Sequence, residues 1–378
     1  MSLTKVYVDI QVADWPETRS VLSRIHLPWE TVRDSRDVFE NVSAAEDPVR
    51  FGKQVLFLTC NKGAFIRDCP GTRGYVCCRY RILHIGTCCT MDCAYCILQA
   101  YFHPPVLQYF VNHADLITEL KHSFDENRLS RLGTGEFTDS LIWENWSDLS
   151  TRLVAAFAGQ NCSVLEFKTK TAAIDRLQGL AHNRKTILAW SLNSERIIAR
   201  EEQGTASLSA RLRAAARAQA WGYPLAFHFD PLVIYDGCAE DYRRTIQQLF
   251  AAVEPDNIVW ISLGTLRFMP ALKPIIARRF PRSRIIYGEF VRGLDGKMRY
   301  FKPLRIELYR KLATWIRELA PQVCVYLCME DETVWQRCLG LQPSQFGGLG
   351  RLLDDSAVKH CGLAAAGLER GHEAGGAG

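Results

Sequence analysis

Four cysteines fall within nine positions of the segment TCCTMDCAYCILQ, at Cys88, Cys89, Cys93 and Cys96. Closely spaced cysteines occur in redox pairs, in metal sites and, more rarely, as packing in a core. A redox pair would use only the last two and leave Cys89 unexplained. The spacing Cys89-x3-Cys93-x2-Cys96 suits a [4Fe–4S] cluster, because such clusters are held by neighbouring thiolates. Three ligands leave one metal position open, as a catalytic centre requires.

Four further cysteines precede this loop, in the segment CNKGAFIRDCPGTRGYVCC: Cys60, Cys69, Cys77 and Cys78. They could supply the distant ligand pair of a structural zinc site or hold a second cluster. The sequence therefore leaves two classes of function open. One is an enzyme with a cluster in the loop, and the other is a zinc-stabilised nucleic-acid-binding protein.

Polar residues that could bind a small molecule gather where predicted strands end. The turn GTGE contains Gly133 and Gly135, which let a ligand approach the backbone, and Glu136, which can accept a hydrogen bond from an ammonium group. The strand FKTKT places Lys168 and Lys170 on one face. The segments WSLN and HFDPL add candidates at the ends of two further strands: Ser191, Asn193 and Asp230.

Strand-like and helix-like segments alternate over most of the chain, and this pattern predicts where these residues meet. Six such units lie between residues 81 and 268, which indicates an α/β fold with a parallel sheet covered by helices. Helices are predicted over 114–127, 172–182, 207–222 and 240–253. A site is expected at the carboxyl ends of the strands, as in barrels. The arginines of the third helix, at positions 211, 213 and 217, are expected to face solvent.

The flanking segments divide the chain into four parts. Residues 1–80 form an N-terminal extension, 81–330 the sheet domain with a hairpin turning at Asp295-Gly296, 331–361 a C-terminal helical segment and 362–378 a disordered Gly/Ala-rich tail. The net charge of +5 is mild, and neither a signal peptide nor a membrane span is visible. We therefore expect a cytoplasmic protein without a membrane partner, in which thiols stay reduced.

The cysteine spacing after the first strand of this repeat resembles the radical S-adenosylmethionine superfamily. The resemblance implies a partial (β/α)6 TIM-type barrel with an N-terminal extension and C-terminal hairpin and α-β additions. It implies two cofactors, a [4Fe–4S] cluster on Cys89, Cys93 and Cys96 and S-adenosyl-L-methionine on the open iron, whose cleavage yields a 5′-deoxyadenosyl radical. A flavodoxin or ferredoxin would be the electron donor. GTGE resembles the superfamily's GGE-type motif, and Lys170 is the expected partner of the cosubstrate carboxylate.

Several longer blocks are similar to the spore photoproduct lyase family, which reverses a methylene-bridged thymine dimer in DNA. They include CAYCILQAYF, FKTKTAAIDRL, WSLNSERII and WGYPLAFHFDP. Tyr95 and Glu136 are the catalytic candidates that this resemblance implies. Two departures stand out. The lyases have Tyr-Cys-Tyr at the last cluster cysteine, where this chain has Ile97, and their hydrogen-donor cysteine is absent from GEFTDSLIWENW, where Phe137 or its neighbour takes its place.

DNA is an expected partner for a second reason. The segments RRFPRSR and KMRYFK combine cations for phosphates with aromatic rings for bases. The residues predicted to contact nucleic acid are Arg278, Arg279, Arg299 and Tyr300. In the lyases, a hairpin at this position engages the lesion.

Overall fold

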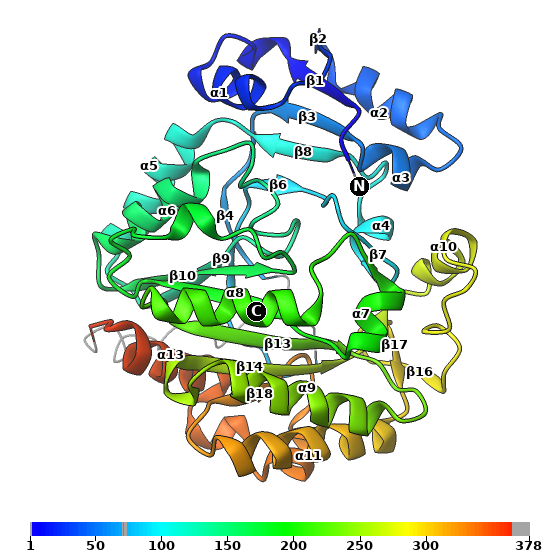
Figure 1. Cartoon of the computed structure of the whole chain (residues 1–378), viewed down its shortest axis with the longest axis vertical. Helices are drawn as coiled ribbons and strands as arrows, with labels where there is room; N and C mark the ends of the chain where they lie inside the picture. The colour runs from blue at the N-terminus through cyan, green and yellow to red at the C-terminus, as the bar shows by residue number, and fades with distance from the viewer. Residues whose placement is uncertain (1, 70, 72–73, 365–378) are drawn as a thin grey trace, which may run out of the picture.

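The computed structural model describes residues 2–69, 71 and 74–364, and its central element is an eight-stranded sheet curled into a half-barrel (Figure 1). Every neighbouring pair is parallel except the last, β5 with β4. The predicted partial barrel is thus confirmed, with one added strand at each edge of its six. The spatial order is β18 (Val325–Leu327), β14 (Ile258–Thr265), β13 (Leu225–Leu232), β11 (Thr186–Ser191), β10 (Ser163–Thr169), β9 (Ser130–Gly133), β5 (Arg81–Leu83) and β4 (Ile66–Asp68).

Amphipathic helices pack on the outer face of this sheet (Figure 1). They are α5 (His113–Asp125), α6 (Leu149–Ala158), α8 (Leu208–Ala220), α9 (Cys238–Ala252) and α11 (Lys302–Leu319). The helix predicted over 172–182 is wrong: only Asp175–Leu177 forms a single 3-10 turn, and Gly179 follows in the left-handed region with φ 73°. A helix that the sequence did not predict, α7 (Glu195–Glu201), begins where the Ser194 side chain accepts from the Ile197 amide.

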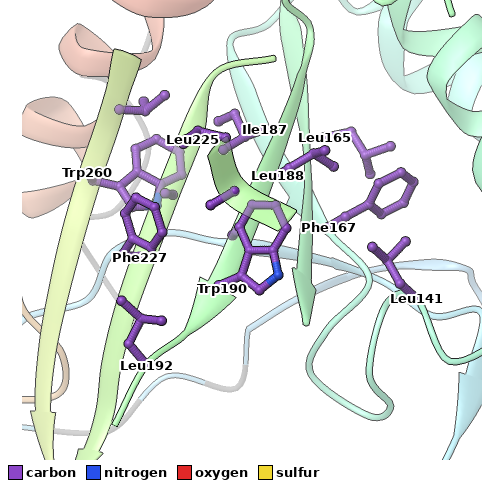
Figure 2. Close-up of a cluster of buried hydrophobic side chains, with 14 of the residues drawn as sticks. Leu141, Leu165, Phe167, Ile187, Leu188, Trp190, Leu192, Leu225, Phe227 and Trp260 are labelled. Carbon is purple, nitrogen blue, oxygen red and sulfur yellow. The ribbon is translucent and has the colours of Figure 1, made fainter. Parts of the chain in front are cut away.

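The core lies between these helices and the strands. All residues of β11 and β14 are buried, as expected for parallel strands covered on both faces. Figure 2 shows part of this core, with side chains from β10, β11, β13 and β14 packed together. Those labelled include Phe167, Trp190, Phe227 and Trp260. The half-barrel is therefore a rigid support for the residues at its strand ends.

The N-terminal section contributes three strands to a second, five-stranded sheet at one end of the half-barrel (Figure 1). Its strand order is β2 (Trp29–Val32), β1 (Lys5–Asp9), β3 (Val55–Thr59), β8 (Leu107–Phe110) and β6 (Gly86–Thr87). Its helices are α1 (Pro16–Arg24), α2 (Ser35–Ser43) and α3 (Pro48–Gly52). Because β6 and β8 come from the chain on either side of the cysteine loop, this sheet fixes both ends of that loop.

The predicted hairpin is present and forms a small antiparallel sheet. Its order is β15 (Arg267–Phe268), β17 (Met298–Tyr300) and β16 (Phe290–Arg292), and Gly296 in its turn has φ 76°. Helix α10 (Leu272–Arg279) precedes it, and α12 (Glu332–Leu339) and α13 (Gly348–Cys361) follow α11 and β18. Most of the predicted disordered tail, residues 365–378, lies outside the described residues. None of the helices in the described part of the chain has the length and apolar character that crossing a bilayer requires.

The half-barrel is not closed on itself. Among the described residues, β18 and β4 are the two edges of the sheet, with no ladder between them. The segment 76–80 passes near this gap, because the Val76 amide donates to the Glu330 carbonyl at 3.0 Å and Arg131 on β9 donates to the Cys78 carbonyl. We call this gap the lateral seam.

Candidate functional site

The three predicted cluster ligands lie together at the carboxyl end of the half-barrel. Cys89 and Cys93 are buried in a small cluster of their own, which Cys96 flanks. Cys88 instead packs into the main core, with its backbone in the left-handed region at φ 63°. All four are free thiols. The loop thus places Cys89 and Cys93, flanked by Cys96, in one cluster and Cys88 in the main core.

The surroundings of these thiols suit a [4Fe–4S] cluster. Burial raises the pKa of Cys89 to about 12 and also raises that of Cys93, whereas Lys53 lowers the first and Lys170 lowers the second. Two ammonium groups are therefore placed to offset the charge of bound thiolates. No three Cys, His, Asp or Glu side chains in the described ranges converge on one metal ion. A four-iron cluster does not need such convergence, because each cysteine binds its own iron, whereas the zinc interpretation does.

The loop is held from the N-terminal side by a buried lysine. The Lys53 ammonium donates to the Met91 carbonyl at 2.6 Å and to the Asp92 carboxylate at 3.0 Å. Arg279 forms ion pairs with the same carboxylate, at 3.0 Å, and with Asp47, also at 3.0 Å. Sequence reasoning missed Lys53 because nothing near it in the chain marks it.

A second buried network holds the opposite side of the loop. Tyr95 donates its hydroxyl proton to Glu202, which forms an ion pair with Arg211 at 2.5 Å. Glu202 lies on β12 (Glu202–Gln203), which pairs with β7 (Asp92–Cys93). Arg211 also donates to the Ser191 carbonyl at 2.8 Å. The expectation that Arg211 faces solvent is wrong, since its side chain is 0% exposed.

Alternate residues of β10, and Lys170 directly after it, face the interior of the half-barrel. Lys170 lies nearest the cysteines, with its ammonium 5.9 Å from the centre of the Tyr95 ring. Glu166 accepts from Trp260 at 3.0 Å and is hydrogen-bonded to His228 at 2.9 Å. Lys168 lies between these two levels on the same face. The two lysines therefore occupy different depths, Lys170 beside the cysteines and Lys168 further in.

The glycines of GTGE are required by packing within the protein. A Cβ at Gly133 would overlap the Tyr80 hydroxyl, and one at Gly135 would lie 3.0 Å from the Lys168 Cβ. Glu136 raises the pKa of Lys168, and it also raises that of Cys69. Because the adjoining Gly135 packs on Lys168, this turn passes beside Lys168.

Two of the predicted cosubstrate residues already have partners inside the protein. Asp230 forms a bidentate pair with Arg267 at 3.0 and 2.9 Å. The Asn193 amide donates to the Pro231 carbonyl at 2.8 Å and accepts from the Tyr242 hydroxyl at 2.8 Å. Both groups are engaged at once, so their geometry favours a structural role.

Three of the four residues predicted to contact nucleic acid are engaged or buried inside the protein. Arg299 and Tyr300 are each 2% exposed, and Arg299 forms an ion pair with Asp295 at 2.7 Å. The Arg279 guanidinium is already engaged in the ion pairs with Asp47 and Asp92. Arg278 is exposed as predicted. Large side chains at the same end that do reach solvent are Tyr287 at 61% and Phe301 at 48%. Alternation along the strand could have shown that Phe301 and Tyr300 face opposite ways.

The upstream cysteines do not form one group. Cys69 lies near Cys77 and Cys78, which each raise its pKa slightly beyond the main effect of burial. Cys60 lies elsewhere, beside Asp9 and Asp115. Residues 70, 72 and 73 between them are outside the described part of the chain. Among the described residues, these cysteines thus form no four-ligand arrangement that could hold a second metal centre.

Comparisons with known proteins agree with this geometry. A family model described as spore photoproduct lyase matches residues 76–322, well over half of the chain. Spore photoproduct lyase of Bacillus subtilis (strain 168) is 28% identical over 247 residues, which cover 62% of this chain and 72% of the relative. That of Geobacillus sp. (strain Y412MC61) is 27% identical over 64% and 74% of the two chains.

Solved structures of the same kind share the fold. A spore photoproduct lyase variant with bound AdoMet and dinucleoside spore photoproduct superposes with a TM-score of 0.77 at 21% identity, covering 87% of this chain and 99% of that one. A second, complexed with dinucleoside spore photoproduct, also has a TM-score of 0.77 at 21% identity and covers 86% and 99%.

Proposed function

Because this chain belongs to the spore photoproduct lyase family, we propose that it removes a hydrogen atom from a pyrimidine photolesion in DNA and so starts its reversal. The chain is a radical S-adenosylmethionine enzyme that uses a [4Fe–4S] cluster, like the rest of this family. The observation that carries the proposal is the grouping of Cys89, Cys93 and Cys96 at the mouth of a half-barrel, apart from Cys88.

Cys89, Cys93 and Cys96 would hold the cluster, and the residues around them would position the cosubstrate. When bound, the two cofactors supply a carbon radical that can take a hydrogen atom from a substrate. Lys170 would bind the carboxylate of adenosylmethionine, and the position of its ammonium beside Cys93 and the Tyr95 ring supports this role. The Ser191 carbonyl accepts a hydrogen bond from Arg211, so the end of β11 would form a rigid wall of the cosubstrate site.

The way in which hydrogen returns to the product differs from the family pattern. Phe137 stacks on Tyr101 at 5.8 Å and packs against His84 at 4.9 Å, between ring centres. A phenyl ring has no readily donated hydrogen, and Ile97 has no hydroxyl. Cys162 and Cys238 are not well placed to replace the missing hydrogen donor. Cys162 precedes β10, at the amino end of the strand, and Cys238 begins α9.

We also propose the reductant and the compartment. A flavodoxin or ferredoxin would deliver the electron that the cluster needs. All fourteen cysteines are free thiols in the structure, which supports a reducing, cytoplasmic location.

The test is anaerobic reconstitution with iron and sulfide, followed by reduction and assay of 5′-deoxyadenosine. We expect adenosylmethionine cleavage, and release of thymine dinucleotide from dinucleoside spore photoproduct. The Cys93→Ala variant should lose both, and Cys88→Ala should keep both. Cleavage that no lesion stimulates, together with no repair, would leave a radical enzyme with another substrate. The internal pairing of Arg279 and Arg299 favours this second candidate, because it removes two cations from the DNA-facing edge.

A further inference from the structure

Lys168 is a cation inside the half-barrel without a direct partner. Its backbone amide donates to Ser140 at 3.0 Å, but in the part of the chain that the structure describes its ammonium group makes no hydrogen bond and no ion pair. A charge in such an environment is normally paired, since desolvation is costly. The side chain therefore has hydrogen-bonding capacity to offer to a ligand.

Carboxylates surround this ammonium at longer range. Burial lowers the pKa of Lys168, but Glu136, Glu166 and Asp230 outweigh burial and the net shift is upward. Two of these three are occupied by other partners, Glu166 by His228 and Asp230 by Arg267. Lys168 is thus kept charged by neighbours that do not bind it directly.

Glu136 is the third carboxylate, and it too is free. No described residue donates a hydrogen bond to it or pairs with it, and it is partly exposed. It lies three residues beyond β9, and Lys168 is the last residue but one of the neighbouring parallel strand. A Cβ at the adjoining Gly135 would lie 3.0 Å from the Lys168 Cβ, so the turn that carries Glu136 passes beside Lys168. An acceptor and a donor that no described residue engages therefore lie near each other without forming a direct ion pair.

The local charges decide which ligand fits. A phosphate would gain Lys168 but would also meet the fields of Glu136, Glu166 and Asp230, which repel it in a medium of low dielectric constant. A neutral ligand with a carbonyl oxygen next to an N–H satisfies the lysine and the glutamate without adding charge. Thymine rings carry this pattern on their imide edge, where the ring N3–H lies between two carbonyl groups.

We propose that Lys168 and Glu136 bind the imide edge of a pyrimidine in the lesion. The lysine donates to a ring carbonyl and the glutamate accepts the hydrogen of the ring N3. This inference rests on the proposed function. It places the base about 7 Å further into the half-barrel than Lys170, two residues along the same strand.

The test compares two ligands on the reconstituted holoenzyme with adenosylmethionine present: dinucleoside spore photoproduct, and the same compound methylated at both N3 positions. The wild type should bind the methylated compound at least tenfold more weakly. In Glu136→Ala this discrimination should fall below threefold, and Glu136→Gln, which keeps an acceptor oxygen, should restore part of it. Lys168→Met should weaken binding of both compounds about tenfold. The exposed Lys121→Met is the matched control and should behave as wild type.

The outcomes separate this inference from the proposed function. Equal binding of the two compounds by the wild type, or undiminished discrimination in Glu136→Ala, would overturn the inference alone. Weaker adenosylmethionine binding in Glu136→Ala with discrimination intact would assign Glu136 to the cosubstrate and would also overturn it. Failure of the wild type to bind either compound would overturn the proposed function together with the inference. Iron content and thermal melting of each variant identify those that fail to fold.

Discussion

The Lys53 ammonium lies 3.0 Å from the Asp92 carboxylate, although the two residues are 39 positions apart. Lys53 follows α3 of the N-terminal section, and Asp92 lies on β7 between two cluster ligands. The side chains are 3% and 9% exposed. The N-terminal section is therefore part of the cluster site, because it supplies a buried charge to the cysteine loop.

Lys53→Met should destabilise the protein and weaken cluster retention. Removing one member of a buried ion pair costs about 3–5 kcal/mol, and the lower end applies here because Arg279 still pairs with Asp92. Urea unfolding of the metal-free protein and the iron content after reconstitution measure the two effects. Lys5→Met breaks an exposed pair with Glu30 and should cost less than about 1 kcal/mol. Equal losses in the two variants would contradict the special role of Lys53.

Neighbouring arginines on α10 should behave differently. Arg278→Ala should weaken DNA binding and reduce its salt dependence with little change in stability, because this side chain is exposed. Arg279→Ala should lower the unfolding free energy by about 3 kcal/mol, because it leaves the buried carboxylate of Asp92 with one partner fewer. Titration of irradiated DNA at two salt concentrations, with urea unfolding, gives both values. A DNA effect from Arg279 without a stability effect would show that the ion pairs open in solution.

Tyr95→Phe should separate packing from catalysis. The Tyr95 hydroxyl is already committed to Glu202, which Arg211 also binds. Removing it leaves a buried carboxylate with one donor fewer, so we expect a loss of about 1–3 kcal/mol in unfolding free energy. The rate of 5′-deoxyadenosine formation should stay within about threefold of wild type. A larger loss of rate without a loss of stability would make Tyr95 a catalytic residue.

His84 should make stability depend on pH. Burial lowers the pKa of His84 to about 4, and neither ring nitrogen has a hydrogen-bond partner among the described residues. The unfolded chain therefore binds more protons than the folded one between about pH 6.5 and 4. Stability is full above this range and is lost as the pH falls through it, by up to about 3 kcal/mol.

Urea unfolding at several pH values checks this sign. His84→Leu should lose less stability than wild type between pH 7 and pH 4.5. The exposed His26→Gln is the control and should follow the wild-type curve. An identical pH dependence in His84→Leu would mean that another group, such as His113, dominates the acid response.

The parts of this molecule that the sequence predicted are those whose signals are local. The alternation of strands and helices predicted the half-barrel, and three cysteines in one short loop predicted the position of the cluster site. The residues that hold the loop were missed because their partners are remote, as with Lys53. The burial of Arg211 could have been predicted from the sequence. Leu208, Leu212 and Ala215 are apolar residues at helical spacing, and they place Arg211 on the buried face of α8. The burial of Arg299 depends on how the hairpin docks, which no local pattern encodes.

The lateral seam between β18 and β4 bears on how a polymer reaches the interior. A barrel closed all round by hydrogen bonds is entered only along its axis, and a lesion within a long strand has no free end to thread. Here one flank is covered by a stretch of coil, which the Val76 amide ties to the Glu330 carbonyl, and Tyr75 lies under Arg299 with 4.2 Å between the guanidinium and the ring centre. A continuous chain that entered the half-barrel from the side would have to pass this flank, where isolated contacts rather than a strand ladder join the described residues.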